Sequence, residues 1–148
     1  MRAVVLREFG DVGNAKVDDF PDPEPGPGEV LIRVQAVAAN FVDLLVIGGK
    51  YQFLPDLPFV PGKGPAGIVA GVGRGVTNVS PGDRVLAMAE QGGYGELVTA
   101  PAINVFKLPD SLSFVDAASM SLVYDTAWFA LFERGRLAAG ETALILGA

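Results

Sequence analysis

The chain has 148 residues, of which 50% are hydrophobic and 19% charged, so its composition suits a globular protein with a substantial core. Its formal net charge of −6 disfavours binding to nucleic-acid phosphates, which requires clustered Lys and Arg. It contains no cysteine and no histidine, which excludes disulfides, Cys/His zinc sites, cysteine nucleophiles and Ser-His-Asp triads within the chain.

Short apolar runs separated by turn residues predict that the first two thirds of the chain are mainly β. The 19 glycines and 11 prolines are typical of short strands joined by tight turns. Residues 1–7 alternate as a strand does. In residues 29–38, Val30 and Ile32 fall on one face and Arg33 on the other, as a half-buried strand requires. Further strands are expected at residues 67–73, 84–88, 94–100 and 104–108.

A short helix is expected after the strand at 29–38. Asn40 can cap the free amides of a first turn, Asp43 occupies the third helical position, and Gly48-Gly49 can end the helix. A carboxylate at the start of a helix is stabilised by the free amides there, so Asp43 is interpreted as structural. The helix is too apolar to face water all round and is expected to pack against the strands.

Helices replace strands after residue 110. Ser113 and Asp116 have the spacing of a capping box, and apolar side chains at helical offsets predict a second helix from about residue 125 to 133. The apolar run at 143–146 then predicts a buried strand that enters Gly147-Ala148. A strand entering a glycine is how a dinucleotide-binding βαβ unit begins, although a terminal strand of a single domain fits the same residues.

Many short motifs follow one another in a particular order along nearly the whole chain. They are Pro27-Gly28-Glu29-Val30-Leu31, Asn40-Phe41-Val42-Asp43, Gly48-Gly49-Lys50-Tyr51, Pro58-Phe59-Val60-Pro61-Gly62, Ala66-Gly67, Gly71-Val72-Gly73, Pro81-Gly82-Asp83-Arg84-Val85, Gly92-Gly93-Tyr94-Gly95-Glu96, Lys107-Leu108-Pro109, Thr126-Ala127 and Gly140-Glu141. Each motif alone is commonplace. Their succession resembles the N-terminal region of zinc-free medium-chain dehydrogenases/reductases, and of quinone oxidoreductases among them.

The resemblance implies a fold and an activity. Residues 1–124 would form a GroES-like, partly open β-barrel that binds substrate, with mainly β structure and short helices. Residues 125–148 would form a linking helix and the first strand of a Rossmann domain whose remainder is missing. The parent protein would use NADPH to reduce quinones or activated alkenes and carbonyls by hydride transfer without zinc. The 148-residue chain alone would be inactive, and the parent would be a homodimer.

The resemblance also implies three site residues and no metal ligand. Asn40 would approach the nicotinamide and the substrate, Tyr51 would line the substrate side, and Thr126 would hydrogen-bond the nicotinamide carboxamide. Asn40 and Tyr51 are thus the candidate catalytic residues, and Asn40 and Thr126 the candidate cofactor-binding residues. Simpler roles remain open: a helix cap for Asn40, a partly buried aromatic for Tyr51 and helix initiation for Thr126.

In relatives that use zinc, a metal-binding Cys stands at the position that resembles Asn40, and a His stands at the position that resembles Lys63. Neither Asn40 nor Lys63 can bind zinc in this way. Two further departures from the family pattern affect the expected pocket. Lys63-Gly64-Pro65 stands where relatives commonly have an acidic residue after Pro-Gly. Leu45 occupies a place that is tyrosine in some quinone reductases, so the pocket is expected to be more apolar.

The expected partner is a small-molecule quinone or enone, with neither nucleic acid nor a membrane as a partner. No apolar run of about 18 residues is present, and the first residues resemble a strand rather than a leader, so a cytoplasmic location is expected. The alternative function is a stand-alone GroES-like binding or assembly module without catalysis. An enoyl-thioester reductase is a further alternative, which the acidic charge balance disfavours.

Overall fold

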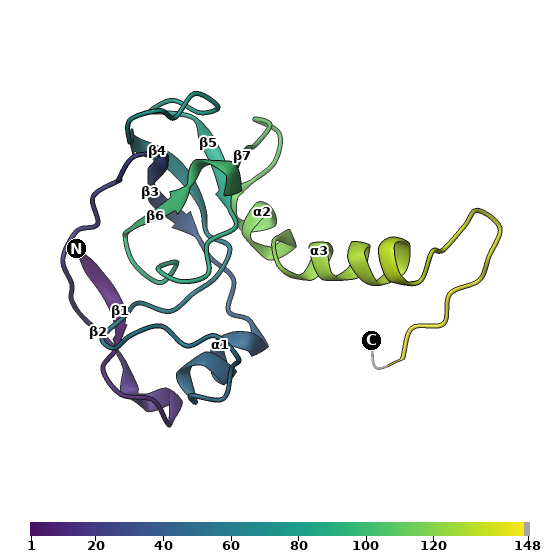
Figure 1. Ribbon diagram of the computed structural model, residues 1–148, viewed down its shortest axis with the longest axis horizontal. Helices are drawn as coiled ribbons and strands as arrows, with labels where there is room; N and C mark the ends of the chain where they lie inside the picture. The colour runs from purple at the N-terminus through teal and green to yellow at the C-terminus, as the bar shows by residue number, and fades with distance from the viewer. Residues whose placement is uncertain (147–148) are drawn as a thin grey trace.

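Two antiparallel sheets form the body of the protein in the computed structural model, which describes residues 1–146 (Figure 1). In the smaller sheet, β1 (Arg2–Leu6) pairs with β2 (Ala15–Asp19). The larger sheet has the strand order β6-β3-β4-β5-β7. Its strands are β3 (Glu29–Ala36), β4 (Ala66–Val72), β5 (Arg84–Ala87), β6 (Leu97–Pro101) and β7 (Val105–Lys107). Because β6 and β7 lie at opposite edges, the barrel is not closed, and the predicted mainly β, partly open barrel is confirmed.

The pattern that predicts β3 also explains its central place in the larger sheet. Val30 and Ile32 are fully buried, whereas Arg33 is exposed. Val30 lies opposite Val72 of β4 on one side and opposite Ala100 of β6 on the other. Burying each of these aliphatic side chains stabilises the fold by about 1.5–3 kcal/mol. The β3 strand therefore supplies the middle of the main core.

The β2 strand lacks the pattern that predicts a strand, and its sequence shows why. Ala15–Asp19 reads Ala-Lys-Val-Asp-Asp, and four of its five residues are exposed. It pairs with β1 through the backbone, with Val17 opposite Val4. A strand held by backbone hydrogen bonds on a solvent-facing edge needs no apolar alternation, which is the signal used to predict strands.

The first helix, α1 (Phe41–Ile47), forms at the predicted position. The Oδ2 atom of Asp43 accepts a hydrogen bond from the Asn40 backbone N–H at 2.8 Å, and Gly49 follows the helix with a φ of 67°. Val46 and Ile47 are buried in a cluster with Leu6 and Phe59. Two short 3₁₀ turns connect strands elsewhere: Val12–Asn14 lies between β1 and β2, and Ala102–Asn104 lies between β6 and β7.

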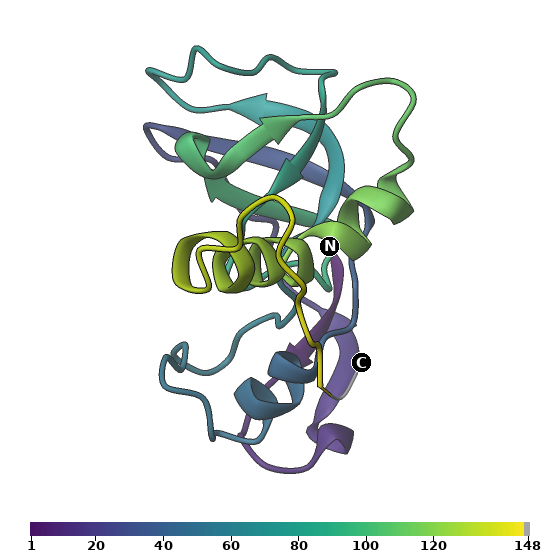
Figure 2. The same ribbon diagram turned by 90° about the vertical axis from the view of Figure 1, so that its right-hand side faces the viewer.

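Two further helices follow the last strand: α2 packs against the larger sheet, and α3 leads away from it (Figures 1 and 2). The predicted cap of α2 (Phe114–Met120) is confirmed, because Ser113 Oγ accepts from the Asp116 backbone N–H at 3.0 Å. The next helix, α3 (Val123–Trp128), begins two residues earlier than expected and continues as a π-helical segment, η3 (Phe129–Arg134). Its large apolar side chains are largely exposed, and Trp128 is 61% exposed. None of the helices among residues 1–146 is long and apolar enough to cross a lipid bilayer.

The prediction of a strand at 143–146 is wrong. These residues have no regular secondary structure, and Leu144 and Leu146 are 82% and 84% exposed. An apolar run becomes a strand only where neighbouring strands satisfy its backbone groups, and no strand among the described residues pairs with this run. The expected turn at Gly147-Ala148 lies outside the described residues.

A close contact joins the barrel to α2. Gly64 lies in the buried loop between α1 and β4, has a φ of 63°, and accepts a hydrogen bond at its carbonyl from Ser121 Oγ at 3.3 Å. A Cβ atom on Gly64 would lie 2.0 Å from that Oγ. Only glycine fits here, because both the backbone conformation and the space exclude a side chain.

We expect Gly64→Ala to destabilise the fold far more than Gly75→Ala. Gly75 also has a positive φ, of 87°, but a Cβ atom added to it would meet nothing within 4 Å, so its substitution costs only the backbone strain of about 1–2 kcal/mol. Gly64→Ala adds an overpacking cost of about 1–3 kcal/mol. Urea unfolding followed by circular dichroism measures both, and equal losses would contradict the contact with Ser121.

Candidate functional site

The start of α1 holds a buried carboxylate that fixes Asn40. Asp43 is 4% exposed, and its Oδ2 accepts hydrogen bonds from the Asn40 backbone N–H and from the Tyr94 hydroxyl, both at 2.8 Å. The Asn40 side-chain amide donates to the Ala38 carbonyl at 3.3 Å. Asp43 therefore has the structural role expected of it, and it positions the backbone on which the Asn40 side chain is carried.

Tyr94 keeps its proton because of this carboxylate and its own surroundings. Burial, followed by the hydrogen bond to Asp43 and the negative charge of Asp43, raises the pKa of Tyr94 well above the usual 10.0. A protonated phenol can donate to a carboxylate, whereas a phenolate would repel it. Tyr94 therefore remains a donor to Asp43 at pH values at which an ordinary tyrosine begins to ionise.

Tyr51 lies beside a buried lysine. The Lys63 ammonium is 5.2 Å from the centre of the Tyr51 ring, within the range of a cation–π interaction. Lys63 also forms an ion pair with Glu90, which comes from the loop after β5. The Lys63 side chain is 8% exposed and that of Glu90 is 84% exposed. The structure thus gathers an aromatic ring, a buried cation and a solvated carboxylate from three separate segments.

Two hollows meet at this cluster. The larger has a volume of about 420 Å³, and Lys63, Glu90 and Gln91 supply its polar groups. Its remaining lining is apolar and comes from Val46, Phe53, Leu54 and Pro55. The smaller hollow, of about 70 Å³, is lined by Tyr51, Lys63, Gly64, Met88, Ala89, Glu90 and Leu122. An apolar cavity with a few convergent polar groups is the usual form of a small-molecule site.

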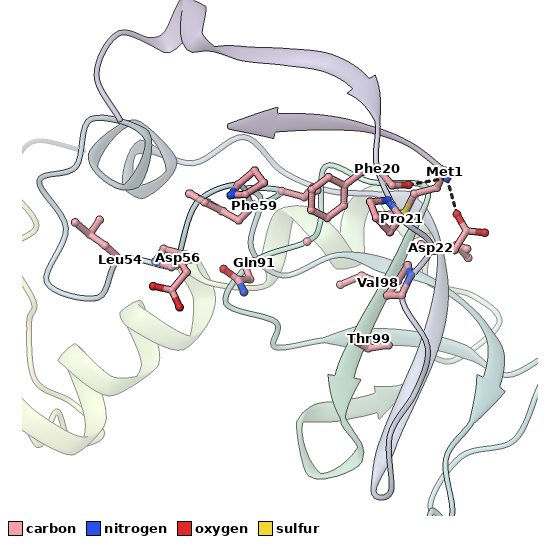
Figure 3. A pocket seen from close by; sticks show the side chains of 16 residues that line it. Met1, Phe20, Pro21, Asp22, Leu54, Asp56, Phe59, Gln91, Val98 and Thr99 are labelled. Atoms are coloured by element: carbon pink, nitrogen blue, oxygen red, sulfur yellow. Dashed lines mark hydrogen bonds and ion pairs between the residues drawn. The ribbon is translucent and has the colours of Figure 1, made fainter. Parts of the chain in front are cut away.

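A hollow of about 680 Å³ lies on the side of the N-terminus (Figure 3). Phe20 and Phe59 lie in its wall, and the Met1 amino group pairs there with Asp22. None of the three predicted site residues lines it, although it shares Leu54, Pro55 and Gln91 with the 420 Å³ hollow. Because its described lining includes no buried lysine or arginine, we place the candidate site at Lys63 instead.

Thr126 lies apart from the Lys63 cluster, on α3. It is exposed, and its hydroxyl donates to the Leu122 carbonyl at 2.7 Å, which is a common bond for threonine within a helix. Leu122 itself lines the smaller hollow with Tyr51 and Lys63. The structure therefore brings Tyr51 into the cluster, places Asn40 at the start of α1, and puts Thr126 one helical turn beyond the cluster. Their roles as site residues stay predictions.

Sequence reasoning identifies Lys63 only as a departure from the family pattern and does not single out Glu90. The available signal was a lysine within Pro61-Gly62-Lys63-Gly64-Pro65, a loop of residues that otherwise carry no charge. Such a loop is more easily buried than a polar one, but the sequence does not show whether its lysine turns inward. The partner, 27 residues away, gives no comparable local signal. Among residues 1–146, no group of three or more carboxylates gathers as a metal site would need.

Comparison with known proteins defines the family. Residues 26–110 match the model of the alcohol dehydrogenase GroES-like domain, which is more than half of the chain. The chain belongs to this family. Its mainly β architecture and open barrel agree with that of a GroES-like domain, so the predicted family, similar to quinone oxidoreductases of the medium-chain dehydrogenases/reductases, is confirmed.

Individual relatives of this GroES-like domain protein match along nearly all of the chain. The human synaptic vesicle membrane protein VAT-1 homolog is 38% identical over 147 residues, which are 98% of this chain and 37% of the relative. Rat quinone oxidoreductase is 38% identical over 150 residues, covering 100% of this chain and 46% of the relative. A mycobacterial structure complexed with NADPH has a TM-score of 0.88 and 38% identity, covering 95% of this chain and 44% of its own. The chain thus spans less than half the length of these relatives.

We expect Tyr94→Phe to destabilise the fold by about 1–3 kcal/mol at neutral pH, because Asp43 loses a hydrogen bond in a buried place. The difference from the wild type should shrink as the pH rises above 10. Above pH 10, Tyr94 loses its proton in the unfolded chain but keeps it in the folded protein, where its pKa is raised. This ionisation stabilises the unfolded wild type, whereas the phenylalanine variant has no such group and is unaffected.

Urea unfolding at a series of pH values measures this difference. Tyr124→Phe is the matched control, because Tyr124 is 62% exposed on α3. A gap between the wild type and Tyr94→Phe that does not shrink as the pH rises above 10 would show that Asp43 and burial do not hold the proton on Tyr94.

Proposed function

We propose that this chain supplies the acceptor-binding part of an oxidoreductase that reduces quinones, or activated alkenes and carbonyls, with NADPH and without zinc. The observation that supports it is a buried cation in an apolar hollow, on a chain that is similar over its whole length to a quinone oxidoreductase. A hollow of about 420 Å³ is within the range that binds one small molecule. Because Lys63 is buried, its charge is less screened by water and acts more strongly on a molecule bound beside it.

Two residues of this chain carry hydrogen-bonding groups of the kind that the nicotinamide end of the cofactor needs. The exposed Thr126 hydroxyl donates its proton to the Leu122 carbonyl. Its oxygen can therefore still accept a hydrogen bond from a carboxamide N–H. Asn40 offers a half-buried amide at the start of α1. We assign these two residues to the nicotinamide and Tyr51 to the acceptor. When bound, NADPH would supply the hydride.

The remaining expectations belong to the same proposal. Residues 1–124 would be the substrate domain and residues 125–148 the link to a dinucleotide-binding domain. Because the chain spans less than half of its relatives' length, we propose that hydride transfer needs residues beyond this chain, which alone would be inactive. A homodimeric parent protein and a cytoplasmic location complete the proposal, and gel filtration and cell fractionation test these two points.

We expect the full-length natural protein to oxidise NADPH when a small quinone or cyclohexenone is present, and to do so equally after treatment with a metal chelator. The decrease of NADPH absorbance measures this. An absence of acceptor-dependent oxidation, with tight binding of another molecule, would instead support a binding or assembly module.

We expect Thr126→Val to raise the KM for NADPH about 3- to 10-fold, since one neutral hydrogen bond contributes about 0.5–1.5 kcal/mol. The kcat should change less than the KM, because the lost contact holds the cofactor and not the reacting acceptor. Thr77→Val, at an exposed position between β4 and β5, is the matched control. Equal KM values for both variants and the wild type would remove Thr126 from the cofactor site.

A further inference from the structure

Lys63 is a charged side chain in a place that disfavours charge. It is 6% exposed, and every residue of the loop 61–66 around it is buried. Taking an ammonium group out of water costs several kcal/mol unless partners compensate for the lost hydration. Lysine is also almost never fully buried without such a partner. The contacts of Lys63 therefore show whether its charge is fully compensated within the fold or is left to bind a ligand.

The two partners of Lys63 leave part of its bonding capacity unused. An ammonium group has three N–H donors, and the structure assigns one hydrogen bond, to Glu90. The Tyr51 ring covers another side of the ammonium at 5.2 Å but takes no conventional hydrogen bond. Glu90 itself stays 84% exposed, so its carboxylate keeps most of its hydration. An ion pair in which one partner stays solvated adds little stability, so the pair does not by itself explain why a charge is buried here.

The position of Lys63 connects the cavity to the helix that carries Thr126. Lys63 lines the 420 Å³ hollow together with Phe53 and Leu54, and it lines the smaller hollow together with Leu122. The ammonium is thus a cation shared by the two hollows. A small molecule in the larger hollow would have its apolar part against Phe53 and Leu54 and a polar atom at Lys63.

The charge balance indicates the chemistry of that polar atom. Lys63 and Glu90 together carry no net charge, so a carboxylate entering the hollow would have to displace or face the Glu90 carboxylate. A neutral carbonyl oxygen needs only an unused N–H of Lys63. The pair therefore favours a neutral acceptor over an acidic one.

We propose that Lys63 is a catalytic residue that binds the carbonyl oxygen of a neutral, single-ring enone or quinone, with Glu90 as the group that discriminates against acidic acceptors. This assignment rests on the proposed reductase function. For an enone, the hydride forms a C–H bond at the β-carbon, the C=C π pair moves between the α-carbon and the carbonyl carbon, and the C=O π pair moves onto the oxygen. Lys63 stabilises the negative charge on that oxygen. A proton from water then adds to the α-carbon, the C=O bond re-forms, and the saturated ketone results. The two electrons come from NADPH, which leaves as NADP⁺.

The test uses the full-length natural protein and isotopically carbonyl-labelled cyclohexenone, without NADPH, so that no turnover occurs. A carbonyl that accepts a hydrogen bond from an ammonium absorbs at lower infrared frequency than one in an apolar site. We expect this shift in the wild type and in Lys63→Arg, which keeps the charge and the donors. We expect it to be absent in Lys63→Met. Lys16→Met, at an exposed position on β2, is the matched control and should keep the shift.

With NADPH added, kcat/KM for cyclohexenone should fall about 100-fold in Lys63→Met, as expected when one donor to a developing oxyanion is removed. Lys63→Arg should retain more activity than Lys63→Met. Circular dichroism checks that each variant folds. If Lys63→Met does not fold, the carbonyl shift in the wild type and in Lys63→Arg still tests the site.

A second arm tests the role of Glu90 with cyclohexenecarboxylate as the acidic ligand. We expect Glu90→Gln to tighten carboxylate binding about tenfold, which corresponds to removing one nearby like charge. Binding of cyclohexenone should change less than carboxylate binding. Unchanged carboxylate binding in Glu90→Gln would overturn the role of Glu90.

The outcomes separate this inference from the reductase function. If the wild type reduces cyclohexenone and Lys63→Met matches it in both spectrum and rate, the role of Lys63 is overturned and the reductase function stands. If the wild type shows the Lys63-dependent shift but oxidises no NADPH with any acceptor, the reductase function fails and the carbonyl site stands. An unshifted or undetectable bound carbonyl in both the wild type and Lys63→Arg overturns the site.

Discussion

The buried loop between residues 60 and 65 is the constraint on which the rest of the structure depends. Backbone N–H groups of Gly92, Gly93 and Tyr94 donate to carbonyls of this loop, and the Gly64 N–H donates to the Ala89 carbonyl. Buried peptide groups need such partners, so the loop between α1 and β4 and the loop between β5 and β6 hold each other in place. Tyr94 then reaches Asp43, and Ser121 reaches Gly64. The barrel, α1 and α2 thus meet at one hydrogen-bonded loop.

Most of the fold could be predicted from the sequence because its elements carry strong local signals. The alternation at Val30 and Ile32 predicts β3, and the cap at Ser113 predicts α2. The signals fail where backbone pairing alone decides the structure. Polar Ala15–Asp19 is a strand because β1 pairs with it, and the apolar run at 143–146 is not one because no described strand pairs with it. In both cases the presence or absence of a pairing strand elsewhere in the described residues determines the conformation.

The candidate site was less predictable than the fold, since it depends on burial and on contacts between distant segments. Asn40, Tyr51 and Thr126 follow from resemblance, and the structure places only Tyr51 beside another site group. Lys63 and Glu90 are far apart in the sequence and belong to different loops. No local pattern distinguishes a lysine that turns inward from one that faces water. Only the three-dimensional packing shows that this lysine lies against Tyr51 and lines an apolar hollow.

The position of Trp128 has a consequence for spectroscopy. It is the single tryptophan of the chain, it is exposed on α3, and its ring centre lies 4.4 Å from that of Phe132. The barrel therefore contains no indole, and its aromatic residues emit only as tyrosine and phenylalanine. Tryptophan emission therefore reports on whatever covers or uncovers α3. Tyrosine emission is divided between Tyr51 and Tyr94 in the barrel and Tyr124 on α3, so only the tryptophan signal comes from one end of the molecule.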